Sequence, residues 1–193
     1  MAQPQVADRE REAEPVVVRE GVTVEEYLAM PETTAPHNLI EGRLYMSAAP
    51  SPPHQEIVGR LFSRLLAFAD ETGGRAYPSP TDFMLSDGAI VQPDISYIGP
   101  DRLDIVRERV MGDPDIAIEV LSPGTRRFDR VRKLRTYEKN GVSEVWLVDP
   151  DSQTVIVFFN AGTTWEREQS VLFGDDIPSQ IAHIGSGGLE QFA

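Results

Sequence analysis

The chain has 193 residues, a length typical of one domain with a substantial core. It contains no cysteine, which excludes disulfides, thiolate zinc sites and a cysteine nucleophile. Its formal net charge of −13 argues against general affinity for nucleic acid, because such affinity depends on basic surface.

The first residues differ in composition from the rest of the chain. Residues 1–18 are polar and lack periodicity, so we expect a disordered tail there and a single domain over residues 19–193. The tail has no apolar signal-peptide core, and no apolar run approaches the ~20 residues of a membrane helix. We therefore expect a cytoplasmic protein with no membrane partner.

Two helices and a strand are predicted next along the chain. Thr23 and Glu26 have the spacing of a capping box, which predicts a short helix over 23–30. Residues 38–47 suit a strand. Apolar residues then recur at helical spacing over 54–71, and Gly73–Gly74 end this longer helix.

The rest of the chain is richer in strands. The run at 115–122, DIAIEVLS, is predicted to be a strand buried on both faces. A turn signal, Asp87–Gly88, separates two earlier strands. The remaining strand-like runs are 81–87, 89–99, 143–150, 154–160 and 163–169. This order predicts an α/β fold with a mixed sheet.

A basic helix is predicted over 127–140, packed through Phe128, Val131 and Leu134. Residues 126–139 hold seven of the 18 basic residues of the chain and only two acids. A mostly acidic protein with such a helix can present a local anion-binding face.

Two acids on neighbouring strands are the candidates for chemistry. Glu119 lies inside an apolar run with no basic residue within four positions, and an uncompensated buried carboxylate is costly. Asp94 lies in the preceding strand-like run, and Mg²⁺ prefers one or two carboxylates with water and phosphate oxygens. A divalent cation held by both acids would compensate Glu119 and activate water. The alternatives are that Glu119 is exposed at a strand end or paired with a distant arginine, and that Asp94 is a turn or strand-edge residue.

Several ordered motifs resemble one known family. They are LIEGRLYMSAAPSPPHQEIVGRL, QPDISYI, PDIAIEVLSPGT and RKLRTYEKNGVSEVWLVDP. In these motifs the chain closely resembles the Uma family of restriction endonucleases, of the PD-(D/E)XK nuclease superfamily, over roughly residues 22–160. The resemblance implies a restriction-endonuclease-like α/β fold, with a mixed central β-sheet flanked by helices. It also implies Mg²⁺- or Mn²⁺-dependent cleavage of phosphodiester bonds in nucleic acid, for which we expect DNA.

The lysine of the superfamily motif is displaced in this chain. Leu121 fills the slot after Glu119 and one spacer, and residues 119 and 121 of a strand point the same way. The resemblance implies that the lysine has moved to the following helix, where Lys133 is the candidate and Tyr137 shares its face. We expect Asp94, Glu119 and Lys133 to be catalytic. The alternative is that Lys133 is one solvated cation among seven.

Two further residues match the family less decisively. Glu41 is either a third acid near the metal or a strand-end charge, and the position three residues before it, often acidic in the family, is Asn38. His54 could donate to a phosphate or cap the long helix.

Two other functions stay open, namely a non-catalytic nucleic-acid-binding protein of the same fold and a metal-dependent hydrolase of a small phosphorylated molecule. We also expect a homodimer, to which the strand at 154–160 could contribute an interface.

Overall fold

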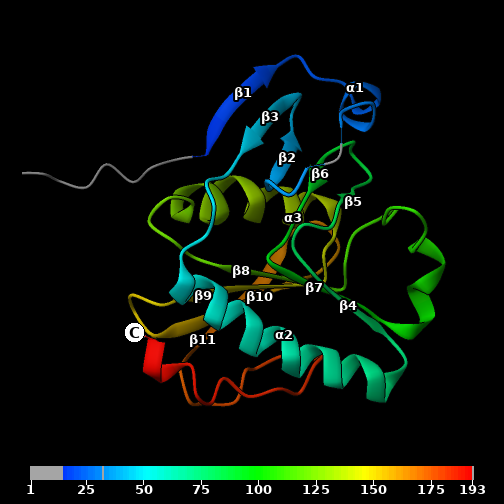
Figure 1. The fold of residues 1–193 in the computed structure, drawn as a ribbon. Helices are drawn as coiled ribbons and strands as arrows, with labels where there is room; N and C mark the ends of the chain where they lie inside the picture. The colour runs from blue at the N-terminus through cyan, green and yellow to red at the C-terminus, as the bar shows by residue number, and fades with distance from the viewer. Residues whose placement is uncertain (1–14, 32, 193) are drawn as a thin grey trace, which may run out of the picture.

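The computed structural model describes residues 15–31 and 33–192, which fold into two β-sheets with helices (Figure 1). The smaller sheet has the strand order β1 (Val16–Glu20), β3 (Arg43–Met46), β2 (His37–Ile40), β6 (Ile90–Val91), β5 (Phe83–Met84). The larger sheet has the order β11 (Trp165–Leu172), β10 (Thr154–Asn160), β9 (Glu144–Asp149), β8 (Ile116–Val120), β7 (Ile95–Ile98), β4 (Arg75–Pro78). Strands β8 and β9 pair in parallel and the other pairs of the larger sheet are antiparallel, so the expected mixed sheet is confirmed.

The helices follow the local signals of the sequence. They are α1 (Val24–Leu28), α2 (Pro52–Thr72) and α3 (Leu134–Asn140), with a π-helical turn η2 (Phe128–Lys133) leading into α3 and 3₁₀ turns η1 (Pro100–Ile105) and η3 (Glu190–Phe192). The predicted capping box of α1 is present, since the Thr23 hydroxyl accepts from the Glu26 amide and the Glu26 carboxylate accepts from the Thr23 amide. Helix α2 ends at Gly73, whose φ of 79° is a left-handed conformation that glycine adopts without strain.

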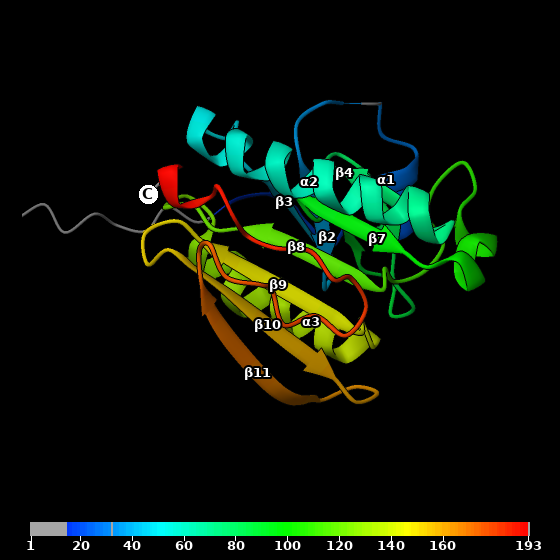
Figure 2. The ribbon, with the colours of Figure 1, turned by 90° about the horizontal axis from the view of Figure 1, so that it is seen from below.

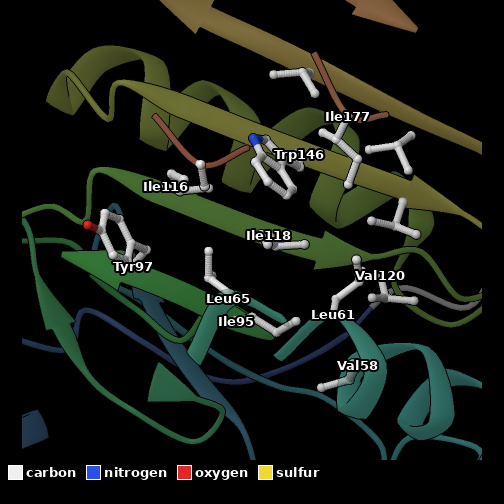
Figure 3. Packing of buried hydrophobic residues seen from close by; sticks show 14 of the residues in the cluster. Val58, Leu61, Leu65, Ile95, Tyr97, Ile116, Ile118, Val120, Trp146 and Ile177 are labelled. Atoms are coloured by element: carbon white, nitrogen blue, oxygen red, sulfur yellow. The ribbon is translucent and has the colours of Figure 1, made fainter. Parts of the chain in front are cut away.

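Helices α2 and α3 cover opposite faces of the larger sheet (Figure 2). On the α2 face, Leu61 and Leu65 pack against Ile118 and Trp146, all 0% exposed (Figure 3). Burial of each such side chain contributes about 1.5–3 kcal/mol, so this layer fixes the sheet firmly on α2.

Strand β8 divides its residues between the two faces. Ile116, Ile118 and Val120 belong to the cluster under α2, whereas Ala117 and Leu121 belong to the cluster on the α3 side. Because side chains alternate along a strand, Glu119 points to the α3 side, as Leu121 does.

The run predicted as one strand over 38–47 is instead the hairpin of β2 and β3, in which Leu39 pairs with Leu44. Glu41 and Gly42 form its two-residue turn, with φ values of 51° and 71°. Two positive φ angles match the right-handed twist of a hairpin, so the chain reverses where a continuous strand was expected.

The run predicted as one strand over 89–99 is also divided. Its first part is β6 in the smaller sheet and its second part is β7 in the larger one. The chain crosses between the sheets at Gln92–Pro93–Asp94, which places Asp94 at their junction.

Two further expectations are corrected. Residues 1–14 of the predicted tail lie outside the described residues, but Val16–Val18 are part of β1, which pairs with β3, so the ordered domain begins earlier than residue 19. Strand β10, proposed as an interface, is paired on both sides, and β11 forms that edge of the sheet.

The helix expected over 127–140 packs through Phe128 and Leu134, as predicted, but not through Val131. Phe128 is buried, but Val131 is 56% exposed because the π-helical turn η2 replaces the first α-helical turns. Its wider hydrogen-bonding period brings Lys133 inward instead. Within 15–31 and 33–192, the structure contains no helix with the length and apolar character needed to cross a membrane.

Candidate active site

A cleft of about 590 Å³ opens where the two sheets meet. Its wall includes four of the residues singled out from the sequence, contributed by the β6–β7 crossing, β8, η2 and α2. They are His54, Asp94, Glu119 and Lys133. Glu41 does not line this cleft and is exposed in the β2–β3 turn, which supports its interpretation as a strand-end charge.

Glu119 is compensated by a lysine of the neighbouring helix. Its Oε2 accepts a hydrogen bond from Lys133 Nζ at 2.8 Å, and its Oε1 accepts one from the Tyr137 hydroxyl at 2.5 Å. Both oxygens act as acceptors, an arrangement that suits an ionised carboxylate. The buried charge therefore has a partner within the protein, fourteen positions away in the sequence.

Lys133 is held on several sides. It is 5% exposed, and its ammonium also donates to the Gln92 carbonyl oxygen at 3.1 Å and lies 3.6 Å from Asp129 Oδ1. Burial alone would lower the pKa of Lys133, but the charges of Glu119, Asp129 and Asp94 outweigh it and raise the pKa above its ordinary value. Lys133 is thus a fixed cation at the base of the cleft.

Asp94 is tied to the end of β8 and to helix α2. Its Oδ2 accepts a hydrogen bond from the Val120 amide at 2.8 Å and lies 3.2 Å from His54 Nε2. Burial would raise the pKa of Asp94, but His54, Lys133 and the Val120 amide together lower it below its ordinary value. Asp94 is therefore an anion that faces the cleft.

His54, in the first turn of α2, contacts Asp94 at the cleft wall. Burial opposes protonation of its ring, but the hydrogen bond and the charge of Asp94 outweigh burial, so the pKa of His54 is raised. Its Nδ1 is buried and has no hydrogen-bond partner in the described part of the chain. His54 contacts a carboxylate here and does not cap α2, whose cap position is Ser51.

The carboxylates of the site influence one another. Burial raises the pKa of Glu119, Lys133 opposes that rise, and the charges of Asp129 and Asp94 add to it. Burial also raises the pKa of Asp129, which is 3% exposed. Repulsion among the acids around Lys133 therefore adds to burial in raising the pKa of Glu119 and of Asp129.

Two residues of the site were not singled out from the sequence. Asp129 lies four positions before Lys133 on the same helix, a spacing that could have indicated it. Gln92 contributes its backbone carbonyl to Lys133, and a backbone contact of this kind leaves no signal in the residue type.

Asp94 and Glu119 are the oxygen donors of the cleft that could hold a divalent metal. Asp94 and Glu119 line one cleft, and Asp94 Oδ1 has no hydrogen bond to a described residue. Within the described ranges no three His, Asp or Glu side chains form a ready metal cage. Mg²⁺ needs only one or two carboxylates, since water and substrate oxygens complete its shell, so the two acids fit such an ion.

Comparison with known proteins agrees with this geometry. A search of curated proteins found no match. Among solved structures, the chain is similar to a crystal structure described as a "putative nuclease" from Anabaena variabilis, at 23% identity and a TM-score of 0.73, over 89% of this chain and 98% of the other. That similarity confirms the restriction-endonuclease-like fold. The model of the Uma2 family, described as "Putative restriction endonuclease", matches residues 24–185, and the chain therefore belongs to the Uma2 family of nucleases.

Proposed function

We propose that this protein is a metal-dependent endonuclease that hydrolyses phosphodiester bonds of DNA. The observation that carries the proposal is that Asp94 lines one cleft together with the buried pair of Glu119 and Lys133. In this cleft, acids and a lysine from separate elements converge where a phosphate can enter.

Asp94 and Glu119 would hold Mg²⁺ or Mn²⁺, which supplies charge neutralisation at the phosphate and an activated water when bound. Lys133 stabilises negative charge on the phosphate. Its raised pKa keeps it protonated, so it acts through its charge and does not accept a proton. His54 positions Asp94 through its Nε2.

The variant Asp94→Asn gives a direct test of the proposed metal site. Asp94→Asn keeps an oxygen that can accept from the Val120 amide but removes the charge. The matched control is Asp70→Asn, because Asp70 is an exposed acid of α2 outside the cleft. Both variants are checked for folding by circular dichroism before use.

We expect calorimetric titration to show Mn²⁺ binding by the wild type and by Asp70→Asn, but not by Asp94→Asn. Plasmid nicking in Mg²⁺ or Mn²⁺ should fall by a factor of about 10² or more in Asp94→Asn alone. Equal Mn²⁺ affinity in all three proteins would contradict the proposed metal site. A nucleotide panel assayed beside the plasmid separates a nuclease from a hydrolase of small phosphorylated molecules.

A non-catalytic nucleic-acid-binding protein is the second candidate, favoured by one observation. Both oxygens of Glu119 are already hydrogen-bonded to Lys133 and Tyr137, so Glu119 needs no metal for its charge. DNA binding without Mn²⁺ binding and without nicking would support this function.

We also propose that the protein acts as a homodimer, because one site per chain cleaves one strand and closed two-fold dimers are the commonest oligomers. Sedimentation velocity at micromolar concentration tests this. A single monomeric species would count against it.

A further inference from the structure

A second cavity of about 470 Å³ lies next to the active-site cleft. Helix α1, the turn after β4 and the loop at residues 106–110 surround it. Two residues, Pro80 and Gln92, line both cavities and form a common wall. A ligand in the second cavity would therefore lie directly beside whatever occupies the cleft.

The common wall is fixed by the partly buried carboxylate of Asp82. Asp82 Oδ1 accepts from the Tyr27 hydroxyl at 2.9 Å and from Gln92 Nε2 at 2.7 Å, and its Oδ2 pairs with Arg109. The Gln92 backbone carbonyl, in turn, accepts from Lys133 Nζ in the cleft. The position of Gln92 thus depends on Asp82 on one side and on the catalytic lysine on the other.

The lining of the second cavity suits a flat, uncharged group. Its charged residues are two acids, Asp82 and Glu108, and two arginines, Arg107 and Arg109, so their formal charges cancel. Tyr27 and Tyr77 also line its wall. Nucleobases stack on aromatic side chains, whereas a phosphate would require an excess of positive charge.

Arg107 is the residue of the second cavity whose side chain is available to contact a bound base. It is exposed at the cavity, and no hydrogen bond or ion pair of its side chain is found among the described residues. An arginine in this state can stack on a base or pair with the phosphate attached to it. Arg109, in contrast, is already committed to Asp82.

We infer that the second cavity binds one unpaired nucleobase of the nucleic acid, next to the phosphodiester held in the cleft. This inference deepens the proposed function and rests on it for the identity of the ligand. It assigns to the site a preference for strands that contain a single-stranded or displaced nucleotide.

Binding of a short oligonucleotide containing 2-aminopurine, in DNA and RNA forms and in the presence of EDTA, tests the inference without any cleavage. Arg107→Ala removes the free guanidinium, and Thr81→Trp fills part of the cavity from a partly exposed position. Arg167→Ala is the control, because Arg167 lies on β11, at the edge of the larger sheet opposite β4.

We expect the first two variants to weaken binding by about tenfold and to reduce the change in fluorescence, as loss of one stacked base does. The control should stay within about twofold. Equal affinity in all four proteins, for both DNA and RNA, would overturn the inference. If Thr81→Trp fails to fold, Arg107→Ala decides the outcome.

The two proposals can fail separately. Base binding that depends on Arg107, in a protein that cleaves nothing with Mg²⁺ or Mn²⁺, would refute the nuclease function and retain the base site. Cleavage that proceeds normally with no effect of Arg107→Ala on binding would refute the base site alone.

Discussion

Replacing Lys133 by methionine keeps a long unbranched side chain but removes the ammonium that faces Glu119. Lys133 is 5% exposed and Glu119 is 1% exposed, so the remaining carboxylate has little access to water. Removing one partner of a buried pair is strongly destabilising, because the other charge is left uncompensated. We therefore expect Lys133→Met to lose stability chiefly through Glu119.

Protonation of Glu119 limits that loss. Keeping the acid protonated costs about 1.36 kcal/mol per pH unit above its ordinary pKa of 4.5, which is at most about 3.4 kcal/mol at pH 7. The same limit is about 0.7 kcal/mol at pH 5. A folded-state pKa raised above the unfolded one adds stability at low pH that disappears as the pH rises. The difference between Lys133→Met and the wild type should therefore shrink as the pH falls.

Glu119→Gln should be tolerated better than Lys133→Met. In that variant the ammonium keeps the Gln92 carbonyl at 3.1 Å and Asp129 at 3.6 Å, so it is not isolated. The double variant Lys133→Met/Glu119→Gln should recover most of the pH-dependent loss, because it leaves no carboxylate at position 119.

Urea denaturation of the four proteins between pH 5 and pH 7.5 measures these differences. A loss in Lys133→Met that does not change with pH would refute the reasoning, since it would mean that Lys133 does not favour the ionised form of Glu119. A double variant as unstable as Lys133→Met at pH 7.5 would refute it equally.

Four further variants test other parts of the fold. Tyr137→Phe should lower the free energy of unfolding by about 1–3 kcal/mol in urea, because a buried carboxylate oxygen loses its donor. Val131→Gln should change the free energy of unfolding by less than about 0.5 kcal/mol, because Val131 is exposed. Phe128→Ala should lower it by about 3–5 kcal/mol, because Phe128 is buried. Similar losses in both variants would contradict the π-helical turn. Burial would raise the pKa of Asp149, but Arg126 lowers it below its ordinary value, so this pair contributes stability that is lost as the pH falls. Asp149→Asn should therefore flatten the acid limb of a plot of unfolding free energy against pH. An unchanged acid limb would refute the pairing.

The elements that could be predicted from the sequence are those with local signals. Neighbouring residues along the chain indicate both the buried strand β8 and the helix α2, which ends at Gly73. The hairpin at Glu41–Gly42 was missed because its turn lacks the usual Asn or Asp before the glycine, although glutamate adopts the positive φ there. The crossing at Gln92–Asp94 was missed because both strands that flank it are apolar and only three residues separate them.

The contacts of the site depend on tertiary structure. The π-helical turn changes which residues of the basic segment are buried, so Lys133 could be selected only from the family resemblance, and Asp129 was not selected at all. No local pattern specifies the five-residue hydrogen-bonding period of such a turn.

Glu119 shows how such a buried acid is better interpreted. No cation lies within four residues of Glu119 along the chain, and the sequence therefore predicted a metal as its partner. Strand alternation, however, places Glu119 on the same face as Leu121, and the next element to pack on that face is the helix that carries Lys133. Because Lys133 already compensates Glu119, charge compensation is no reason for a metal at Glu119. Asp94, whose Oδ1 has no hydrogen bond to a described residue, is instead the side chain whose charge is open to an incoming cation.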